Sequence, residues 1–506
     1  MICNVHTVEE TVELKIAIIF AVLLCAPFVV RGDEQIVVDP NAAHHSFPHF
    51  WEQMFGSGRA ILTLRESYRR DLRTVKAATD FRYVRFHAIL HDEIGIYDED
   101  KHGTPRYNFS YVDQIYDGLL ENGVRPFVEL SFMPSKLASR KTVQGFSYHP
   151  FVAPPREYAR WDALIANFAA HLVERYGIDE VAQWYFEVWN EPNLDFWGGV
   201  PAQATYWTLY DHTARALKQV NSRLRVGGPS TAQAAWVSAF IRHTSDEQVP
   251  LDFVSTHVYG NDKSKDVFGT HELIPRAEMV CRAAKKVHDE VVASSRPNMP
   301  VIWSEYNASY FNEPNITDSI FMGPWLADTL RRCDGLTEMM SYWTFSDVFE
   351  EQGVVRRPFY GGFGLMAAGG IPKPAFNAFK MLHELGDERF ATDSEHALIT
   401  RRPDGTFMIA LWNYVSPGAD GPPITIALRL PEGARTIRLR RLDASHGDVR
   451  GAYAQMGSPQ YPTHEQLEAL RSSSALGAPE ELSIVNHQVS ITLPPNALVT
   501  AEVLLR

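Results

Sequence analysis

The stretch Trp184-Tyr-Phe-Glu-Val-Trp-Asn-Glu-Pro-Asn-Leu-Asp-Phe-Trp197 organises the interpretation of the whole chain. Its first half mixes aromatic and β-branched residues and predicts a buried strand over 184–189. Pro192 cannot donate a ladder hydrogen bond and favours an extended backbone at Glu191, so the strand should end there. An amide, Asn190, and a carboxylate, Glu191, are therefore predicted at the carboxyl end of a strand. A solvated turn explains such a motif equally well when it stands alone.

Seven further apolar segments have the character of this strand, and amphipathic segments separate them. The eight predicted strands cover residues 50–56, 83–90, 125–132, 184–189, 224–228, 253–259, 301–306 and 338–345. Predicted helices cover 67–79, 109–122, 161–176, 202–221, 236–243, 273–294, 320–334 and 374–385. This alternation predicts an α/β fold, a (β/α)8 TIM barrel with insertions. The alternative is a doubly wound open sheet, but no Gly-x-Gly-x-x-Gly motif follows the first strand.

Beyond residue 388 the pattern changes to short apolar runs separated by Pro, Gly and Asp. Strands are predicted at 397–401, 406–413, 424–429, 434–442, 482–486, 489–493 and 499–504, with one helical stretch at 463–473. We therefore predict a barrel domain over 33–388 and a C-terminal antiparallel β-sandwich over 389–506. The leading segment 33–45 is a candidate to pair with the sandwich.

The net charge and the N-terminal residues limit which binding partners and which cellular compartment can be expected. The net charge of −13 argues against nucleic acid or an anionic membrane as the main partner. The apolar run 16–30 suits a signal peptide better than a membrane span, so residues 1–32 are predicted to be an atypical signal peptide. An exported protein, periplasmic or secreted, is expected, with an uncleaved anchor as the alternative and no stable membrane span.

The four cysteines give no metal or scaffold pattern. Cys3, Cys25, Cys281 and Cys333 include no Cys-x-x-Cys pair. If the first two leave with the signal peptide, the mature chain keeps Cys281 and Cys333. Whether these two form a disulfide is left open by the sequence.

Polar residues gather at the carboxyl ends of the predicted barrel strands, where such barrels hold their active sites. They are Arg85, His87, His91 and Asp92 at the second strand, Asn190 and Glu191 at the fourth, His257 and Tyr259 at the sixth, Glu305 and Asn307 at the seventh, and Trp343, Asp347, Glu350 and Glu351 at the eighth. Packing or capping explains any one of them better than catalysis does. Their recurrence at one face of a barrel is difficult to explain by packing.

Two of these residues, Glu191 and Glu305, suit the hydrolysis of a glycosidic bond. That reaction needs one carboxylic acid to protonate the leaving oxygen and one carboxylate to attack the anomeric carbon, about 5–5.5 Å apart in a retaining enzyme. Proximity would raise the pKa of the proton donor. No metal or cofactor is predicted, because His87 and His91 follow a strand and do not share a helical face. The sequence contains no Gly-x-Ser-x-Gly elbow, so it does not indicate a serine hydrolase.

In these motifs the chain resembles glycoside hydrolase family 39, in the clan of retaining (β/α)8 glycosidases. The resemblance rests on 50–56 (FWEQMFG), 85–87 (RFH), 187–194 (EVWNEPNL), 256–259 (THVY), 304–310 (SEYNASY) and 342–350 (YWTFSDVFE). It implies that Glu191 is the acid/base and Glu305 the nucleophile. It also implies a sugar site lined by His87, Asn190, His257, Tyr259, Trp343, Glu350 and Glu351.

The family's two well-known activities are β-xylosidase and α-L-iduronidase. The iduronidase-like pattern places a lysine close to where this chain has Tyr259, and the neutral side chain favours an uncharged sugar. The resemblance therefore implies an exo-acting β-1,4-xylosidase that releases xylose from xylo-oligosaccharides. The alternatives are another β-glycosidase, an endo-acting polysaccharide hydrolase, an iduronidase, and a carbohydrate-binding protein on a degenerate barrel. The oligomeric state is not indicated.

Overall fold

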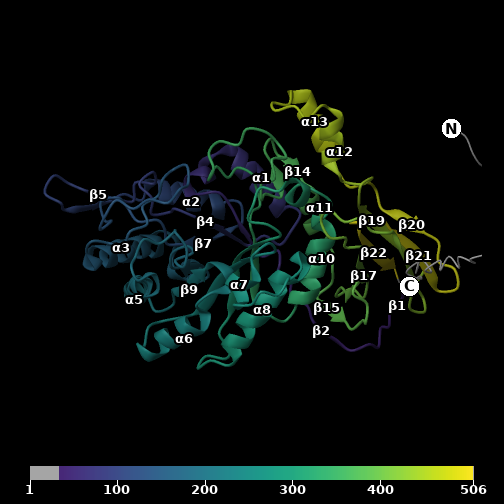
Figure 1. The fold of residues 1–506 in the computed structure, drawn as a ribbon, viewed down its shortest axis with the longest axis horizontal. Coiled ribbons are helices and arrows are strands. Elements are labelled where there is room, and N and C mark those ends of the chain that lie inside the picture. The colour runs from purple at the N-terminus through teal and green to yellow at the C-terminus, as the bar shows by residue number, and fades with distance from the viewer. Residues whose placement is uncertain (1–33, 505–506) are drawn as a thin grey trace, which may run out of the picture.

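A closed barrel of parallel strands is joined to a region of antiparallel sheets in the computed structural model, which describes residues 34–504 (Figure 1). The predicted signal peptide over 1–32 lies outside the described residues. Between residues 34 and 504, no helix has both the length and the apolar character that crossing a bilayer requires.

The barrel confirms the predicted fold class and all eight predicted strands. Its strands are β3 (Met54–Gly56), β4 (Tyr83–Phe86), β7 (Arg125–Glu129), β8 (Tyr185–Glu187), β9 (Arg225–Thr231), β10 (Phe253–Tyr259), β11 (Val301–Asn307) and β12 (Met339–Tyr342). Each strand pairs in parallel with the next one along the chain, and β12 closes the barrel on β3. Because all strands run in one direction, their carboxyl ends form a single face.

Amphipathic helices cover the outside of the barrel, as predicted. They are α1 (Glu66–Lys76), α2 (Ser110–Leu120), α3 (Tyr158–Tyr176), α5 (Ala202–Val220), α6 (Val237–Asp246), α8 (Arg276–Val292), α10 (Met322–Cys333) and α11 (Pro374–Leu382). In α1, for example, Tyr68, Leu72 and Val75 share the buried face at helical spacing. A disulfide joins Cys281 on α8 to Cys333 at the end of α10, which answers the question that the sequence left open.

The C-terminal region is a β-sandwich whose two sheets enclose a core that includes Ile36, Ile409 and Ile426. One sheet has the order β2 (His44–Ser46), β15 (Glu388–Phe390), β16 (Ala397–Arg401), β17 (Phe407–Trp412), β22 (Leu498–Leu504), β19 (Thr436–Leu442) and β20 (Glu480–Leu482). The other has the order β1 (Glu34–Val37), β18 (Ile424–Arg429) and β21 (Gln488–Leu493).

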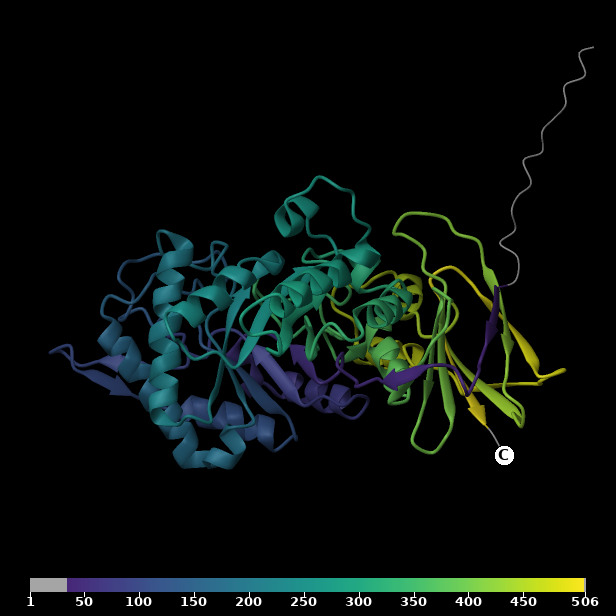
Figure 2. The ribbon, with the colours of Figure 1, turned by 90° about the horizontal axis from the view of Figure 1, so that it is seen from below.

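The N-terminal segment contributes to both sheets of the sandwich. Strand β1 pairs with β18, and it does so in parallel, so the sandwich is not purely antiparallel. Strand β2 pairs with β15 in antiparallel orientation. Figure 2 shows the purple strand β1 beside the green and yellow strands of the C-terminal region. The strand predicted at 482–486 is wrong in position, because β20 ends at Leu482.

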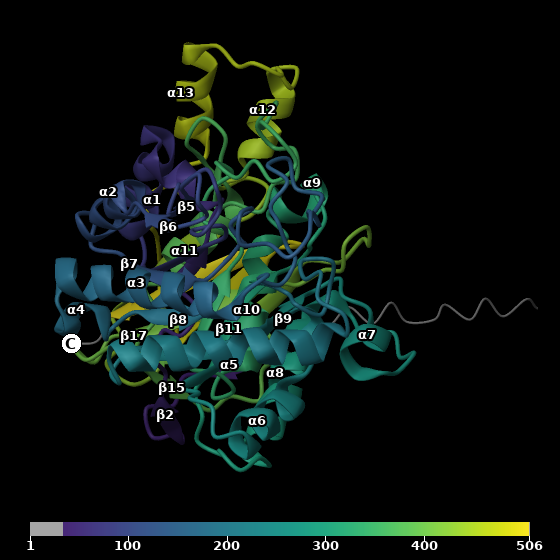
Figure 3. The ribbon, with the colours of Figure 1, turned by 90° about the vertical axis from the view of Figure 1, so that its left-hand side faces the viewer.

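A helical arm, residues 443–479, extends from the sandwich towards the carboxyl-end face of the barrel. It contains α13 (His464–Ser473), which was predicted, and α12 (Val449–Gln455), which was not. Both helices project from the rest of the molecule in Figures 1 and 3. Val449, Tyr453 and Leu470 of the arm form a small core with Phe359 and Ile371 of the barrel domain. This contact places the arm beside the loop that follows β12.

Candidate active site

The two predicted catalytic glutamates meet at the carboxyl ends of their strands. Glu191 follows β8, and Glu305 lies within β11. Three atoms lie within 4.8 Å of one another: a carboxylate oxygen of Glu191, a carboxylate oxygen of Glu305 and a ring nitrogen of His257. This separation agrees with the roughly 5–5.5 Å of retaining glycosidases and is shorter than the roughly 6.5–9.5 Å of inverting ones.

The backbone at Glu191 differs from the extended conformation that we predicted from Pro192. Glu191 has a φ of 43° and Trp189 a φ of 72°, both in the region that non-glycine residues rarely adopt. The Glu191 amide donates to the carbonyl of Ser230 at 2.8 Å, which ties this turn to the neighbouring strand. Packing therefore overrides the local preference, and the strained turn directs the carboxylate into the site.

Both oxygens of Glu305 accept a hydrogen bond from a strong donor. Arg85 donates from Nη1 to Oε1 at 2.7 Å, and the Tyr259 hydroxyl donates to Oε2 at 2.5 Å. Hydrogen bonds of this kind stabilise the ionised carboxylate. These two bonds fix the position of Glu305 and favour its ionised form, as a nucleophile requires.

Arg85 connects Glu305 to a buried network that the sequence did not assign to the site. It is fully buried and binds Glu187 Oε2 at 2.6 Å and Glu129 Oε2 at 2.8 Å. It also donates from Nη2 to Asn190 Oδ1 at 2.9 Å. Because Asn190 Oδ1 is occupied in this way, the amide nitrogen of Asn190 is left to donate to a ligand.

The carboxyls of the two predicted catalytic glutamates differ in their affinity for a proton. Burial and the nearby charge of Glu305 raise the pKa of Glu191 well above its usual range. Burial also raises the pKa of Glu305, but Arg85, His87 and Tyr259 oppose this rise. Glu191 therefore keeps its proton at a pH at which Glu305 has lost its own, as the acid/base and nucleophile roles require.

His257 was predicted to contact the sugar, and the structure places it behind the two glutamates. Its Nδ1 lies 3.0 Å from Glu191 Oε1, and its Nε2 lies 3.1 Å from Ser304 Oγ. Burial and the charges of Arg85 and His87 lower the pKa of His257 well below its usual value, so the ring is neutral. The Ser304 hydroxyl donates to Glu187 at 2.6 Å and therefore accepts from Nε2–H. Nδ1 is then an acceptor, facing the protonated Glu191.

A cavity of about 330 Å³, called the catalytic cavity below, opens above the glutamates. Five of the seven predicted sugar-binding residues line it. These are His87, Asn190, Tyr259, Trp343 and Glu351. Phe146, Phe196 and Phe363 add apolar wall, and none of the three was predicted. A cavity of this size that combines aromatic wall with converging polar groups is typical of a small-ligand site.

Glu350 and Glu351 are adjacent but face different surroundings. Glu351 lines the catalytic cavity, with its Oε1 3.4 Å from His87 Nε2. Burial raises the pKa of Glu351 to about 8, against the opposing charge of His87, so this carboxyl is protonated at neutral pH. Glu350 instead binds Arg65, with Oε1 2.5 Å from Nη1 and Oε2 2.9 Å from Nη2. Only Glu351 of the predicted pair faces the catalytic cavity.

Asp262 is a further carboxylate of the cavity that sequence reasoning missed. It accepts a hydrogen bond from the Tyr259 amide at 2.8 Å, and burial raises its pKa to about 7. Its negative charge is one of those that raise the pKa of Glu191. The signal was present in the sequence, because Asp262 comes three residues after the end of β10, at the same face of the barrel as the predicted site residues.

Glu191, His257 and Glu305 also have the spacing of a metal-binding set. Both Glu305 oxygens, however, already accept hydrogen bonds from Arg85 and Tyr259. The Arg85 guanidinium supplies positive charge at the place where a cation would bind. The arrangement suits proton transfer and nucleophilic attack better than ligation.

Comparison with known proteins adds an independent line of evidence. The model of the family described as "Glycosyl hydrolases family 39" matches residues 34–481. A β-xylosidase of Geobacillus stearothermophilus is 36% identical over 485 residues, which cover 93% of this chain and 95% of the relative. A β-xylosidase of Caldicellulosiruptor saccharolyticus is 36% identical over 447 residues, covering 84% of this chain and 88% of the relative. A solved GH39 β-xylosidase from Caulobacter crescentus has a TM-score of 0.81 at 35% identity, covering 93% of this chain and 99% of that one.

Proposed function

Because this chain belongs to glycosyl hydrolase family 39, we propose that it is a retaining, exo-acting β-xylosidase that releases xylose from xylo-oligosaccharides. The observation that carries this proposal is the pair of carboxylates, Glu191 and Glu305, with oxygens within 4.8 Å of each other and with unequal proton affinities, because the pKa of Glu191 is raised further than that of Glu305. The β-xylosidases to which the chain is similar support the choice of sugar.

In the first step, a Glu305 oxygen attacks the anomeric carbon while the bond to the leaving oxygen breaks. Glu191 transfers its proton to that oxygen, and the shortened chain leaves as an alcohol. The sugar is then esterified to Glu305. Arg85 and Tyr259 hold Glu305 in place for the attack, and the amide of Asn190 is positioned to donate to the sugar 2-hydroxyl.

In the second step, Glu191 acts as the base. Its carboxylate removes a proton from water, the water oxygen bonds to the anomeric carbon, and Glu305 leaves as a carboxylate. Each step inverts the configuration at the anomeric carbon, so the product has the same configuration as the substrate. The lone pair of His257 Nδ1 faces Glu191 at 3.0 Å and disfavours the anion, so that Glu191 readily takes the proton back.

A pentose suits the cavity better than a uronic acid. The groups that line it include the carboxyls of Glu351 and Asp262 and the hydroxyl of Tyr259, with aromatic wall from Trp343 and Phe363. Tyr259 has a neutral hydroxyl that already donates to Glu305, so it does not supply a cation for a sugar carboxylate. This environment favours an uncharged sugar.

We also propose that the protein works outside the cytoplasm. The Cys281–Cys333 disulfide supports this, because such bonds persist in oxidising compartments and are rare in reducing ones.

A substrate panel tests the proposed activity. We expect hydrolysis of an aryl β-xyloside, with slower or no hydrolysis of aryl β-glucoside, α-arabinoside and α-iduronide substrates. Glu305→Ala should abolish turnover, and azide should restore it by forming the inverted glycosyl azide. Glu338→Gln is the matched control, because this exposed carboxylate precedes β12 at the opposite end of the barrel. Full activity in Glu305→Ala, or hydrolysis of the iduronide alone, would disprove the proposal.

A further inference from the structure

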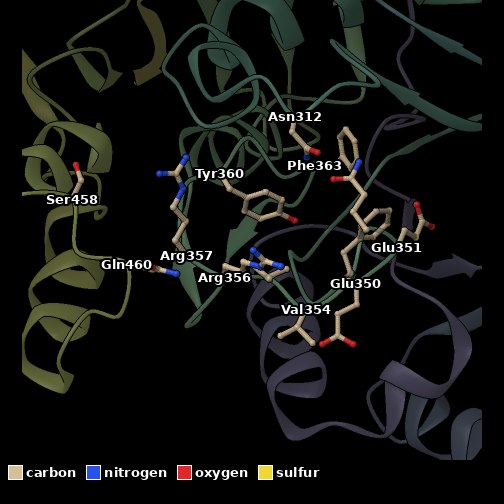
Figure 4. A pocket seen from close by; sticks show the side chains of 14 residues that line it. Asn312, Glu350, Glu351, Val354, Arg356, Arg357, Tyr360, Phe363, Ser458 and Gln460 are labelled. Atoms are coloured by element: carbon tan, nitrogen blue, oxygen red, sulfur yellow. The ribbon is translucent and has the colours of Figure 1, made fainter. Parts of the chain in front are cut away.

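A second cavity, of about 450 Å³, adjoins the catalytic one. Most of its wall comes from the loop that follows β12, and Ser458 and Gln460 of the helical arm complete it (Figure 4). Glu351, Gln352 and Phe363 line both cavities. A ligand that fills the catalytic cavity can therefore carry a substituent into the second one.

The second cavity lies across the barrel from the proton donor. In the closed barrel, β12 is the fourth strand from β8 in either direction, and Glu191 follows β8. The leaving group must lie beside Glu191, because that residue protonates the leaving oxygen. A group in the second cavity is thus attached to the sugar that stays on the enzyme.

Two arginines give the second cavity a positive charge. Arg356 and Arg357 both line it and are exposed, and neither forms an ion pair or a side-chain hydrogen bond with another residue of the range 34–504. The acids of the same wall do not offset them. Glu350 is bound to Arg65 at 2.5 Å, and the pKa of Glu351, raised by burial to about 8, leaves that carboxyl neutral at pH 7.

Contacts between the arm and the barrel domain hold the arm side of this cavity in place before a ligand binds. Arg450 of the arm donates to the Pro314 carbonyl at 2.7 Å and to Asn315 Oδ1 at 3.0 Å, which fastens the arm to the barrel. The ring of Tyr453, also in the arm, packs 5.0 Å from that of Phe359 in the loop. A preformed site loses little entropy on binding.

We propose that the second cavity binds the carboxylate of a uronic acid carried by the terminal xylose of the substrate. The guanidinium groups of Arg356 and Arg357 bind that carboxylate, and neutral groups such as Tyr360 and Gln460 receive the sugar hydroxyls. This inference rests on the proposed xylosidase function and extends it. The enzyme remains exo-acting, because it removes the terminal xylose together with its acidic substituent.

Three substrates and two double variants test this proposal. The substrates are an aryl β-xyloside, a xylo-oligosaccharide with a uronic acid on its non-reducing terminal xylose, and the same oligosaccharide after reduction of the carboxyl to an alcohol. The reduced compound has the same size without the charge. The first variant combines Arg356→Met with Arg357→Met. The second, a control with the same loss of charge, combines Arg242→Met with Arg429→Met, both exposed and on other elements.

For the wild-type enzyme, kcat/KM on the acidic oligosaccharide should exceed that on the reduced one by about tenfold, as expected for a charge-assisted hydrogen bond. The ratio should fall at high salt and fall to about one in the Arg356–Arg357 variant, but not in the control variant. All four arginine replacements should leave aryl xyloside hydrolysis unchanged. The inference would be overturned if this ratio were one in the wild-type enzyme, or if it stayed unchanged in the Arg356–Arg357 variant. Failure to hydrolyse the aryl xyloside would instead refute the proposed function.

Discussion

Arg85 and Lys373 are both fully buried cations that bind more than one carboxylate, but only the network of Arg85 opens onto the catalytic cavity. Lys373 Nζ lies 2.7 Å from Asp318 and 2.9 Å from Asp347, and it donates to the Gly362 carbonyl at 2.8 Å. Arg85 binds Glu129, Glu187 and Glu305 at 2.6–2.8 Å. The two groups use the same chemistry at the same end of the barrel.

They differ in whether one of the carboxylates also faces a cavity. Asp318 accepts from the Gly361 amide at 2.6 Å, and Asp347 accepts from the Gly364 amide at 2.7 Å. The Lys373 network is thereby closed on the chain and holds the loop that lines both cavities. In the Arg85 network, Glu305 faces the cavity, where its oxygens can reach a substrate. A buried ion cluster can take part in catalysis when one of its acids lines a cavity that a ligand can enter.

The largest effect that this comparison predicts is at Arg85. Arg85→Met leaves three buried carboxylates without their shared cation, so Glu305 would bind a proton and lose its nucleophilicity. We expect kcat on an aryl β-xyloside to fall by about a thousandfold or more. Arg85→Lys keeps the charge but not the forked geometry and should recover only part of the activity. Circular dichroism would show that the variants are folded, and a folded Arg85→Met enzyme with normal kcat would break the comparison.

Replacement of Lys373 should act on stability rather than on chemistry. Lys373→Met leaves Asp318 and Asp347 buried without a cation, which should lower the free energy of unfolding by about 3–5 kcal/mol. Thermal and urea unfolding would measure the change, with Lys380→Met on the exposed side of the same helix as the control. The kcat of the folded fraction should change much less than in Arg85→Met. An equal loss of kcat in the two variants would show that the networks are not distinct.

A smaller effect is expected from the second donor to Glu305. Tyr259→Phe removes the hydroxyl that donates to Oε2 at 2.5 Å and leaves the ring in place. A hydrogen bond to a charged group contributes about 1.5–3 kcal/mol, so kcat should fall by about tenfold to a hundredfold. Steady-state kinetics on an aryl β-xyloside would measure it. If the loss equalled that of Arg85→Met, the two donors would have to act as one unit.

The smallest predicted effect is a shift of the pH profile. The negative charge of Asp262 raises the pKa of Glu191, and Asp262 itself ionises near pH 7. In Asp262→Asn this repulsion is absent, so Glu191 should lose its proton at a lower pH. The basic limb of kcat/KM should then move to lower pH by some tenths of a unit, measured with a poor leaving group that needs protonation. A basic limb that stays in place or moves to higher pH would contradict this.

Much of the fold was predictable because each strand and helix has a local pattern. All eight barrel strands followed from apolar runs, and Glu191, Glu305 and Tyr259 followed from their positions at strand ends. What could not be predicted depends on contacts between distant segments. Arg85 stood within a quoted motif, but a sequence does not show that one buried guanidinium will meet three carboxylates.

Side-chain directions at turns were also beyond the sequence. Glu350 and Glu351 are both acidic and adjacent, and the backbone turns at Glu350, where φ is 62°, so that the two side chains diverge. Glu191 likewise adopts a positive φ that its neighbour Pro192 does not favour. Helix α12 was missed because seven residues are too few to show a clear period.

The pairing of β1 with β18 has a consequence for the synthesis of the protein. Glu34 lies opposite Ile426, 392 residues later in the chain (426 − 34). At about 5–20 residues per second, a ribosome needs roughly 20–80 s to cover that distance. For all of this time β1 has no partner strand, and its Ile36, which is buried in the final fold, stays available to other chains. The sandwich holds the earliest strand of the described chain as well as its latest one, so its folding cannot be complete until the ribosome has reached the last described strand.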